Sequence, residues 1–434
     1  MTTSMSIRPL SQYRVIRGKR GEDGVVLILA VFAVVLLTVL AVGIAAAVRV
    51  ELRASRASLD RTQALFMAEA GKNQARAILL YDDAGVDTLI DEWGPDAEEP
   101  LDLPHQIGDG FYRVRVWDAC GRININEADY DTLVRLTGDP AAAASILDWR
   151  DEGEGVTPDG AEKEYYAGLP WPYVPRDGPF QTPGELLLVR GVTPEMYFGS
   201  KEKPGLVDLI TVDSESTNTD TSGAPRMLLN EFRNWGEQAF QDWVVASFGD
   251  ALGMYEAKEI FRGLTELTDL GLDGYTSLAQ LASAAGLDFG TIAQIIDSFT
   301  VEMSPVERGK VNLNTAPAEV IALLPGSSEA LADAIIVRRA AQPFRSLGDV
   351  VTMLIELPDG PTVFEQLIDH VRTKSSSFVI ESMGRTKTGR THRTLSALVR
   401  RTSDAVYVIR QVERDQPLPP LDEDAQQSVA IARR

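Results

Sequence analysis

The sequence predicts an α+β protein, in which a long N-terminal helix precedes a small antiparallel sheet that a large α-helical insertion interrupts. Three observations lead to this prediction. An uncharged apolar run lies near the N-terminus, and alternating apolar and polar residues, typical of strands, occur around residue 114 and again after residue 376. The residues between these strands show helical spacing, and they contain two similar segments.

Composition limits the classes of function. The chain has 434 residues, of which 44% are hydrophobic, so it can bury a core and form two or three domains. Its net charge is −21, and the first 24 residues carry five basic and two acidic side chains, which leaves −24 for the rest. This charge disfavours nucleic acid as a partner, because phosphate binding depends on Lys and Arg. The one cysteine, Cys120, cannot form an internal disulfide.

The apolar run predicts a membrane anchor. Residues 25–48 contain no charge, proline or amide side chain, and a transmembrane helix needs about 20 such residues. Arg14, Arg17, Lys19 and Arg20 precede the run, so the positive-inside rule keeps the N-terminus cytoplasmic and sends the rest across the membrane. The alternative is a cleaved signal peptide ending near Ala47, but such apolar regions usually have about 7 to 15 residues.

The helix continues beyond the anchor. Leu52, Leu59 and Phe66 recur every seven residues among charged side chains, and no glycine or proline occurs until Gly71. We expect one helix over residues 25–80. An apolar and then amphipathic helix of this length before a folded domain resembles that of type IV pilin-like subunits.

Four strands are predicted. Tyr112, Val114 and Val116 alternate with arginines, and strand patterns return at residues 377–383, 391–400 and 405–411. Three C-terminal strands alone would leave a poorly covered edge, so we expect the early strand to join them in one discontinuous sheet. The alternative is a separate C-terminal β unit.

The insertion contains an internal repeat. Residues 121–128 and 309–316 match at an offset of 188. Both are followed by a leucine-rich segment with helical spacing, a glycine and a Pro-Phe pair. We interpret the copies as helix-hairpin-helix-like units, in which Asn126 and Asn314 cap the following helix and Gly138 and Gly326 permit the turn. Asp139 and Pro140 occupy the first turn, which disfavours phosphate binding there.

One acidic loop is a candidate metal site. Many carboxylates lie on a glycine-containing segment, as calcium prefers, although the spacing is not that of an EF-hand. The candidate ligands are Asp148, Asp151, Glu152, Glu154, Asp159 and Glu162. A weaker set is Asp213, Glu215, Asn218 and Asp220. The alternative is a solvated acidic loop without an ion.

No catalytic pattern is found. His105, His370 and His392 are isolated, and phosphate-loop, nucleophile-elbow and zinc motifs are missing from the sequence. We therefore predict that the chain is not an enzyme.

Several stretches together resemble the minor pseudopilin K of the type II secretion system, also called general secretion pathway protein K. They are the basic leader ending at Gly24, Trp117-Asp118-Ala119-Cys120, Ile123-Asn124-Ile125-Asn126, Leu147-Asp148-Trp149-Arg150-Asp151, Gly178-Pro179-Phe180 and Val311-Asn312-Leu313-Asn314-Thr315-Ala316-Pro317. The resemblance implies cleavage by a prepilin peptidase after Gly24 and methylation of Val25. It also implies a structural Ca²⁺, and assembly with the I and J minor pseudopilins at the tip of a periplasmic pseudopilus.

Two residue positions bear on this resemblance. Pilin subunits usually carry Glu at the fifth mature position, which here is Leu29, and protein K is the exception that lacks this acid. Glu22 and Asp23, beside the cleavage point, depart from the usual leader.

The predicted domains are a cytoplasmic leader (1–24), a transmembrane and extended helix (25–80), a discontinuous α/β domain (81–126 and 373–414), an inserted helical domain (127–372) and a disordered tail (415–434). The predicted location is the inner membrane, with one span and a periplasmic C-terminal domain. Two alternatives are a membrane-tethered DNA receptor that uses the hairpins and a minor subunit of a type IV pilus.

Overall fold

The computed structural model describes residues 22–153, 155–249, 252–269, 275–284, 287–387 and 391–418. The predicted leader up to residue 21, the candidate ligand Glu154 and the tail from residue 419 therefore lie outside the described residues. The chain forms two compact units, Met1–Thr62 and Gln63–Arg434.

Helix α1 (Glu22–Tyr81) contains the predicted anchor and its extension, and it ends one residue beyond the predicted limit. Its residues 24–59 are exposed, whereas Ala64, Ala68, Ala75 and Leu79 are fully buried. The apolar side chains of residues 25–48 are exposed in the described structure, and so large an apolar surface is typical of a segment that lies in a nonaqueous environment.

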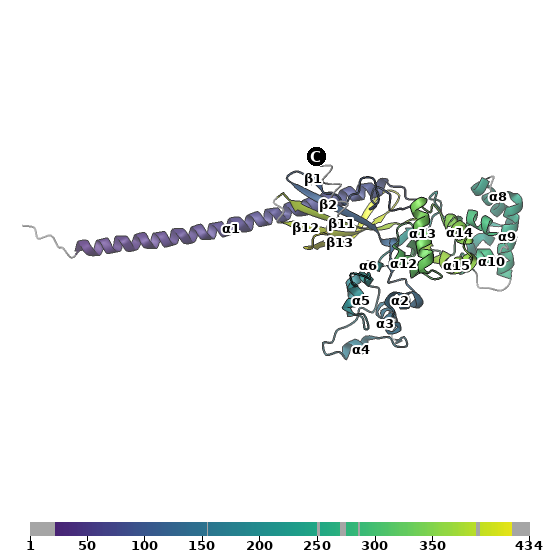
Figure 1. The fold of residues 1–434 in the computed structure, drawn as a ribbon, viewed down its shortest axis with the longest axis horizontal. Helices are drawn as coiled ribbons and strands as arrows, with labels where there is room; N and C mark the ends of the chain where they lie inside the picture. Colours follow the sequence, from purple (N-terminus) through teal and green to yellow (C-terminus); the bar gives the residue numbers. More distant parts are fainter. Residues whose placement is uncertain are drawn as a thin grey trace, which may run out of the picture. The chain divides into compact units, whose positions relative to one another are not determined.

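The sheet is discontinuous, as predicted. It has the order β1-β2-β11-β12-β13, and every neighbouring pair is antiparallel (Figure 1). The strands are β1 (His105–Ile107), β2 (Gly110–Asp118), β11 (Ser377–Thr386), β12 (His392–Arg401) and β13 (Val406–Arg414). In the β2–β11 pair Val116 is opposite Ile380, which joins strands on either side of the insertion. The predicted α+β fold class is confirmed.

The end of α1 packs on this sheet. Ala75 and Leu79 share a buried cluster with Val114, Val116, Phe378, Ile380, Ala397 and Val399. Two polar contacts fix the helix to β13: Lys72 Nζ donates to Gln411 Oε1 at 2.6 Å, and Arg76 Nη2 donates to the Val406 carbonyl at 2.6 Å. The helix is thus held to the sheet by apolar burial and by side chains that reach its edge.

The first repeat of the insertion begins with β3 (Ile123–Asn124) and ends with β4 (Ile210–Thr211), and these two short strands pair in parallel. Between them lie α2 (Tyr130–Thr137), α3 (Pro140–Arg150), α4 (Lys163–Ala167), the 3-10 helix η2 (Pro183–Leu188), α5 (Pro194–Phe198) and α6 (Leu206–Leu209). The later repeat has β9 (Val311–Asn312) parallel to β10 (Val371–Arg372), with α12 (Ala318–Ala322), α13 (Glu329–Ala341), α14 (Leu347–Ile355) and α15 (Gly360–Leu367). None of the two-residue strands was predicted.

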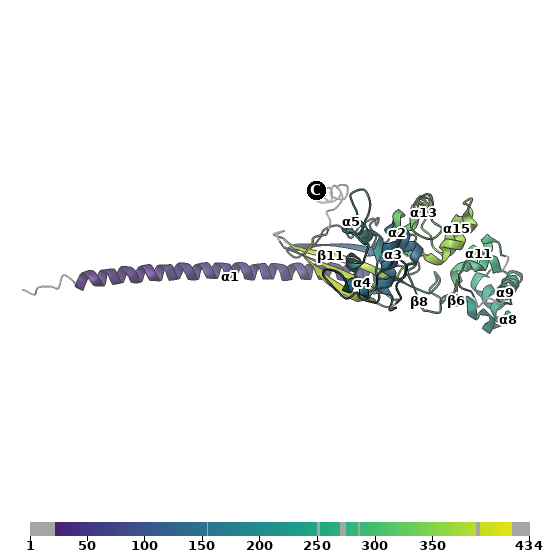
Figure 2. The ribbon, with the colours of Figure 1, turned by 90° about the horizontal axis from the view of Figure 1, so that it is seen from below.

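A middle block separates the two repeats. It comprises β6 (Met227–Leu228), α7 (Phe232–Trp235), α8 (Glu237–Phe248), α9 (Met254–Asp269), α10 (Gln280–Ala284), α11 (Phe289–Ile295) and β7 (Phe299–Thr300). Strands β5 (Glu215–Thr217) and β8 (Val306–Arg308) flank it and pair antiparallel. Helices α8 and α9 lie side by side in both views (Figures 1 and 2).

The predicted caps are wrong, but the predicted turns are confirmed. Asn126 does not cap α2, because its side chain binds both backbone groups of Phe180, and Asp129 caps the helix through Thr132 N. Asn314 likewise binds Phe344 rather than α12. Gly138 and Gly326 adopt φ of 69° and 70°, the left-handed conformation that glycine accepts without strain.

The start of the predicted tail makes contacts. Thr394 Oγ1 donates to the Gln416 carbonyl at 2.7 Å, His392 Nε2 lies 2.8 Å from the Asp415 carbonyl, and Leu418 is buried. Residues 415–418 therefore run beside β12 instead of being free of the fold.

Candidate functional site

The predicted processing site lies in the first turns of α1. Gly24 and Val25 are helical and exposed, and a Cβ at Gly24 would meet nothing within 4 Å. From Gly24 onward α1 is long and apolar enough to cross a membrane, and its most apolar window is fully exposed. The helix therefore has the length and composition of a single membrane anchor.

The candidate metal loop contains two buried carboxylates. Asp148 lies near the end of α3, and Glu162 precedes α4 as its N-cap residue. Asp148 is 1% exposed and Glu162 6% exposed. One oxygen of Asp148 accepts from Thr157 N at 3.0 Å, but no hydrogen-bond donor among the described residues reaches Asp148 Oδ2 or Glu162 Oε1.

The charges of this loop repel one another. Burial raises the pKa of Glu162, and the neighbouring carboxylates of Asp148, Asp151 and Asp177 raise it further. Unpaired buried carboxylates are costly unless a cation or a proton compensates them. Two orphaned carboxylate oxygens on a loop with further acids fit a hard cation such as Ca²⁺.

The other predicted ligands that the structure describes are more exposed than Asp148 and Glu162. Asp151 and Glu152 are exposed, as is Asp159, whose φ of 66° marks a tight turn. Asp177, which the sequence analysis did not select, acts on Glu162 from 15 residues further along the chain. Its φ of 55° is also left-handed, so the backbone bends sharply at both acids.

The weaker candidate set is used for ion pairs and backbone contacts. Arg400 Nη2 lies 3.4 Å from Asp213 Oδ1 and 3.1 Å from Glu215 Oε2. The Asn218 amide donates to the carbonyls of Glu302 and Ser304 at 3.1 and 2.9 Å. These side chains already have protein partners, so we do not assign them to a metal.

A third acidic cluster was not predicted. In the described parts of the chain, Asp82, Asp87 and Asp91 form a group of three acids whose ligand atoms lie within 4.8 Å of one another. Arg401 occupies this cluster: its Nη1 is 3.1 Å from Asp82 and its Nη2 is 2.6 Å from Asp87. The guanidinium offsets part of this negative charge, and burial raises the pKa of Asp82 to about 6 and that of Asp87 to about 8, which favours their neutral forms. We therefore do not assign an ion to this cluster.

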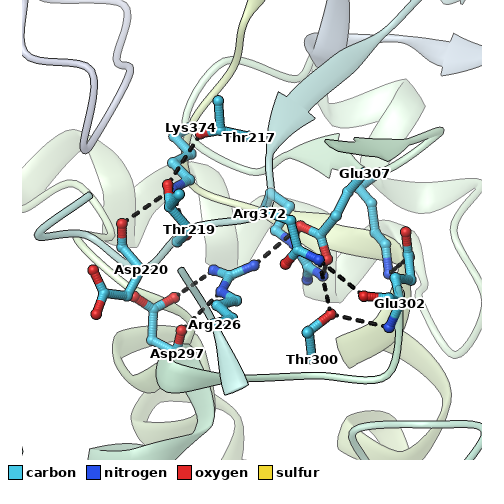
Figure 3. A network of polar contacts seen from close by, with 12 residues as sticks. Thr217, Thr219, Asp220, Arg226, Asp297, Thr300, Glu302, Glu307, Arg372 and Lys374 are labelled. Carbon is cyan, nitrogen blue, oxygen red and sulfur yellow. Dashed lines mark hydrogen bonds and ion pairs between the residues drawn. The ribbon is translucent and has the colours of Figure 1, made fainter. Parts of the chain in front are cut away.

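A buried charge network lies where the middle block joins the rest of the second unit (Figure 3). Arg226 binds Asp297 at 2.8 Å and Glu307 at 3.0 Å, and Arg372 also binds Glu307. Burial by itself would raise the pKa of Glu307, but the charges and hydrogen bonds of Arg372 and Arg226 outweigh it and lower the pKa to about 2. Lys374 lies beside these residues, and its Nζ donates to Thr219 Oγ1 at 2.6 Å.

Two family models match the chain, and both describe "Type II secretion system (T2SS), protein K". One matches residues 125–199 and the other residues 311–365. These two segments of the chain therefore match the protein K family of the type II secretion system. The two matches fall on the two repeats that the sequence analysis identified, so the internal repeat consists of the two protein K segments. The prediction that the chain is a minor pseudopilin K is confirmed.

Among solved structures, the chain is similar to the GspK-GspI-GspJ complex from enterotoxigenic Escherichia coli. The two chains are 13% identical, and the alignment covers 83% of this chain and 99% of that chain with a TM-score of 0.46. No curated protein matches the sequence. The family is one of structural pseudopilin subunits, so its members act in assembly.

Proposed function

We propose that this protein K is the tip subunit that initiates the periplasmic pseudopilus for protein export across the outer membrane. It acts as a structural component and turns over no substrate. The observation that supports this proposal is the occurrence of two protein K segments in a chain whose helix α1 carries a long, exposed apolar stretch. Its proposed partners are the I and J minor pseudopilins, which accompany GspK in the Escherichia coli complex.

The charge distribution supports one topology. Arg14, Arg17, Lys19 and Arg20 precede the apolar residues 25–48, so the N-terminus remains cytoplasmic and α1 spans the inner membrane once. The rest of the chain is then periplasmic. A strongly acidic unit of this kind also disfavours the DNA-receptor alternative, because it would repel phosphate.

The tip position follows from Leu29. In a pilin packed in lipid, a Glu at this position would pair with the N-terminal amine of a neighbouring subunit, because an unpaired charge there is expensive. Leu29 offers no such partner, and a subunit without it fits best where no subunit precedes it. We therefore place this chain at the start of the filament.

The decisive experiment is intact-mass spectrometry of the chain purified from the membrane. Cleavage by the prepilin peptidase after Gly24, followed by methylation, predicts a mature chain that begins with N-methylated Val25. A Gly24→Leu variant should keep its leader and serves as the control. A wild-type chain that retains residues 1–24, or that is cut after Ala47, would contradict pseudopilin processing.

We also propose that Asp148 and Glu162 hold a structural Ca²⁺, with Asp151 and Asp177 as the nearest additional acids. The support is the pair of buried carboxylate oxygens without donors. The ion would neutralise the repulsion among these groups and hold the loop after α3 against the rest of the first repeat.

A further inference from the structure

The middle block, residues 226–303, lies outside both family matches, yet its ends repeat a feature of the matched segments. Strand β6 pairs in parallel with β7, with Met227 opposite Phe299. In the same way Ile123 is opposite Ile210 in the first repeat, and Val311 is opposite Val371 in the later one. All three segments therefore start and finish side by side on a two-residue parallel ladder.

In each segment an asparagine side chain makes the same two hydrogen bonds to the backbone of an aromatic residue. Asn230 Nδ2 donates to the Tyr275 carbonyl at 3.0 Å, and Tyr275 N donates to Asn230 Oδ1 at 2.7 Å. Asn126 makes this pair of bonds with Phe180, and Asn314 makes it with Phe344. Each asparagine stands three residues after the first residue of its opening strand, and each partner is aromatic.

The agreement continues after the aromatic residue. The side chain five positions later accepts a hydrogen bond from the backbone N–H that directly follows the aromatic residue. The acceptors are Glu185 for Gln181 N at 3.1 Å, Gln280 for Thr276 N at 2.8 Å and Asp349 for Arg345 N at 2.7 Å. In each case this bond lies at the start of a helix, and further helices follow before the closing strand.

We infer that residues 226–303 are a third copy of the protein K repeat. Three elements carry the inference: the parallel strand pair, the asparagine bonds to an aromatic residue, and the acceptor five positions later. The second unit thus carries three copies of one module where the family matches identify two.

The differences explain why the third copy is inconspicuous in the sequence. Leu228 stands where the other copies have Asn124 and Asn312, and Tyr275 follows glycine where Phe180 and Phe344 follow proline. The asparagine at this position has a structural role in the last copy, because Asn312 Nδ2 donates to Asp118 and to Ser375 near the sheet. The third copy therefore lacks the polar attachment that this position gives the last copy.

The third copy instead packs on the last one. Leu278 N donates to Asp369 Oδ1 at 2.9 Å, and the rings of Phe289 and Phe364 meet edge to face at 5.5 Å. Both of its ends are held at one residue of the surrounding chain, because the Asn218 backbone bonds to Pro305 O at 2.9 Å and to Arg226 N at 3.5 Å. The block is thus inserted at a single point and extends the array by one module.

Hydrogen exchange on the full chain in detergent tests the inference and does not depend on secretion. Asn230→Ala should speed amide exchange roughly tenfold at Tyr275 and in β6 and β7, and leave β3 and β4 as in wild type. Asn314→Ala is the matched variant, and it should act on Phe344, β9 and β10. Gln280→Ala, which removes only the acceptor for Thr276 N and Ser277 N, is a milder second variant within the same copy.

The outcomes separate clearly. Faster exchange confined to residues 227–300 in both Asn230→Ala and Gln280→Ala supports a third module with its own closure. Unchanged exchange at Tyr275, Met227 and Leu228 would overturn the inference, because Asn230 would then not stabilise Tyr275 or the pairing of β6 with β7. Deprotection that extends equally into β3 and β4 or into the sheet would also overturn it, since the block would then be part of one undivided core.

Discussion

Glu307 connects the third copy to the rest of the chain through two arginines, and its charge should make stability depend on pH. Its pKa is lowered from 4.5 to about 2 in the folded chain, so the stabilisation is complete above pH 4.5 and is lost as pH falls toward 2. The size of this contribution is roughly 3 kcal/mol. We expect urea unfolding of wild type and Glu307→Gln to differ by about this amount at pH 6.

The same comparison at lower pH supplies the control. The difference between wild type and Glu307→Gln should shrink steadily from pH 4.5 to pH 2. Glu381→Gln, which removes the partner of half-exposed Arg414, should follow the wild-type profile within about 1 kcal/mol. Parallel profiles for wild type and Glu307→Gln would contradict the role given to this carboxylate.

The carboxylates Asp148 and Glu162 make calcium binding testable. Calcium at 100 times its Kd should stabilise the wild-type chain by roughly 2.7 kcal/mol, measured as a rise in Tm. Asp148→Asn and Glu162→Gln should lose this response, because each removes a buried charge that the ion would neutralise. Asp213→Asn, at an acid that binds Arg400, should retain it. A wild-type Tm that does not change between calcium and chelator would exclude the site.

Individual elements show what could be predicted from the sequence. Strands β2, β11, β12 and β13 were predicted to within a few residues because their patterns extend over five or more positions, which is enough to show a period. Two-residue strands have no period, so β3, β4, β6, β7, β9 and β10 could not be predicted. Asp177 was missed for a related reason, since only folding brings it near Glu162.

The contact between α1 and β11 depends on the absence of a side chain at Gly384. A Cβ there would overlap the Ala64 carbonyl and lie close to Ala68 N, both backbone atoms that cannot move aside. We expect Gly384→Ala to lower the free energy of unfolding by roughly 1–3 kcal/mol, measured by urea denaturation. Gly178→Ala is the control, because a Cβ there would meet nothing within 4 Å. Equal stability of the two variants would show that α1 is not packed against β11.

At the scale of the whole molecule, the exposed apolar helix should decide where the chain is found. We expect the full chain to remain in the membrane fraction after an alkaline carbonate wash, and a variant without residues 25–48 to be released. In spheroplasts, added protease should reach residues beyond 81 in the wild-type chain. Retention of the shortened variant would show that the anchor lies elsewhere, and a protected C-terminal part would reverse the topology.

The pairing of β2 with β11 also has a consequence for how the protein is made. The two strands adjoin in space, but residues 119–376 are synthesised between them. During synthesis β2 must wait, with the hydrogen-bonding edge that later meets β11 still open, until the last strands have emerged. Each repeat closes on its own ladder, so the modules can mature while the chain is still emerging. Completion of the sheet is then the late and slow event, because it joins residues that are 260 to 276 positions apart in the sequence.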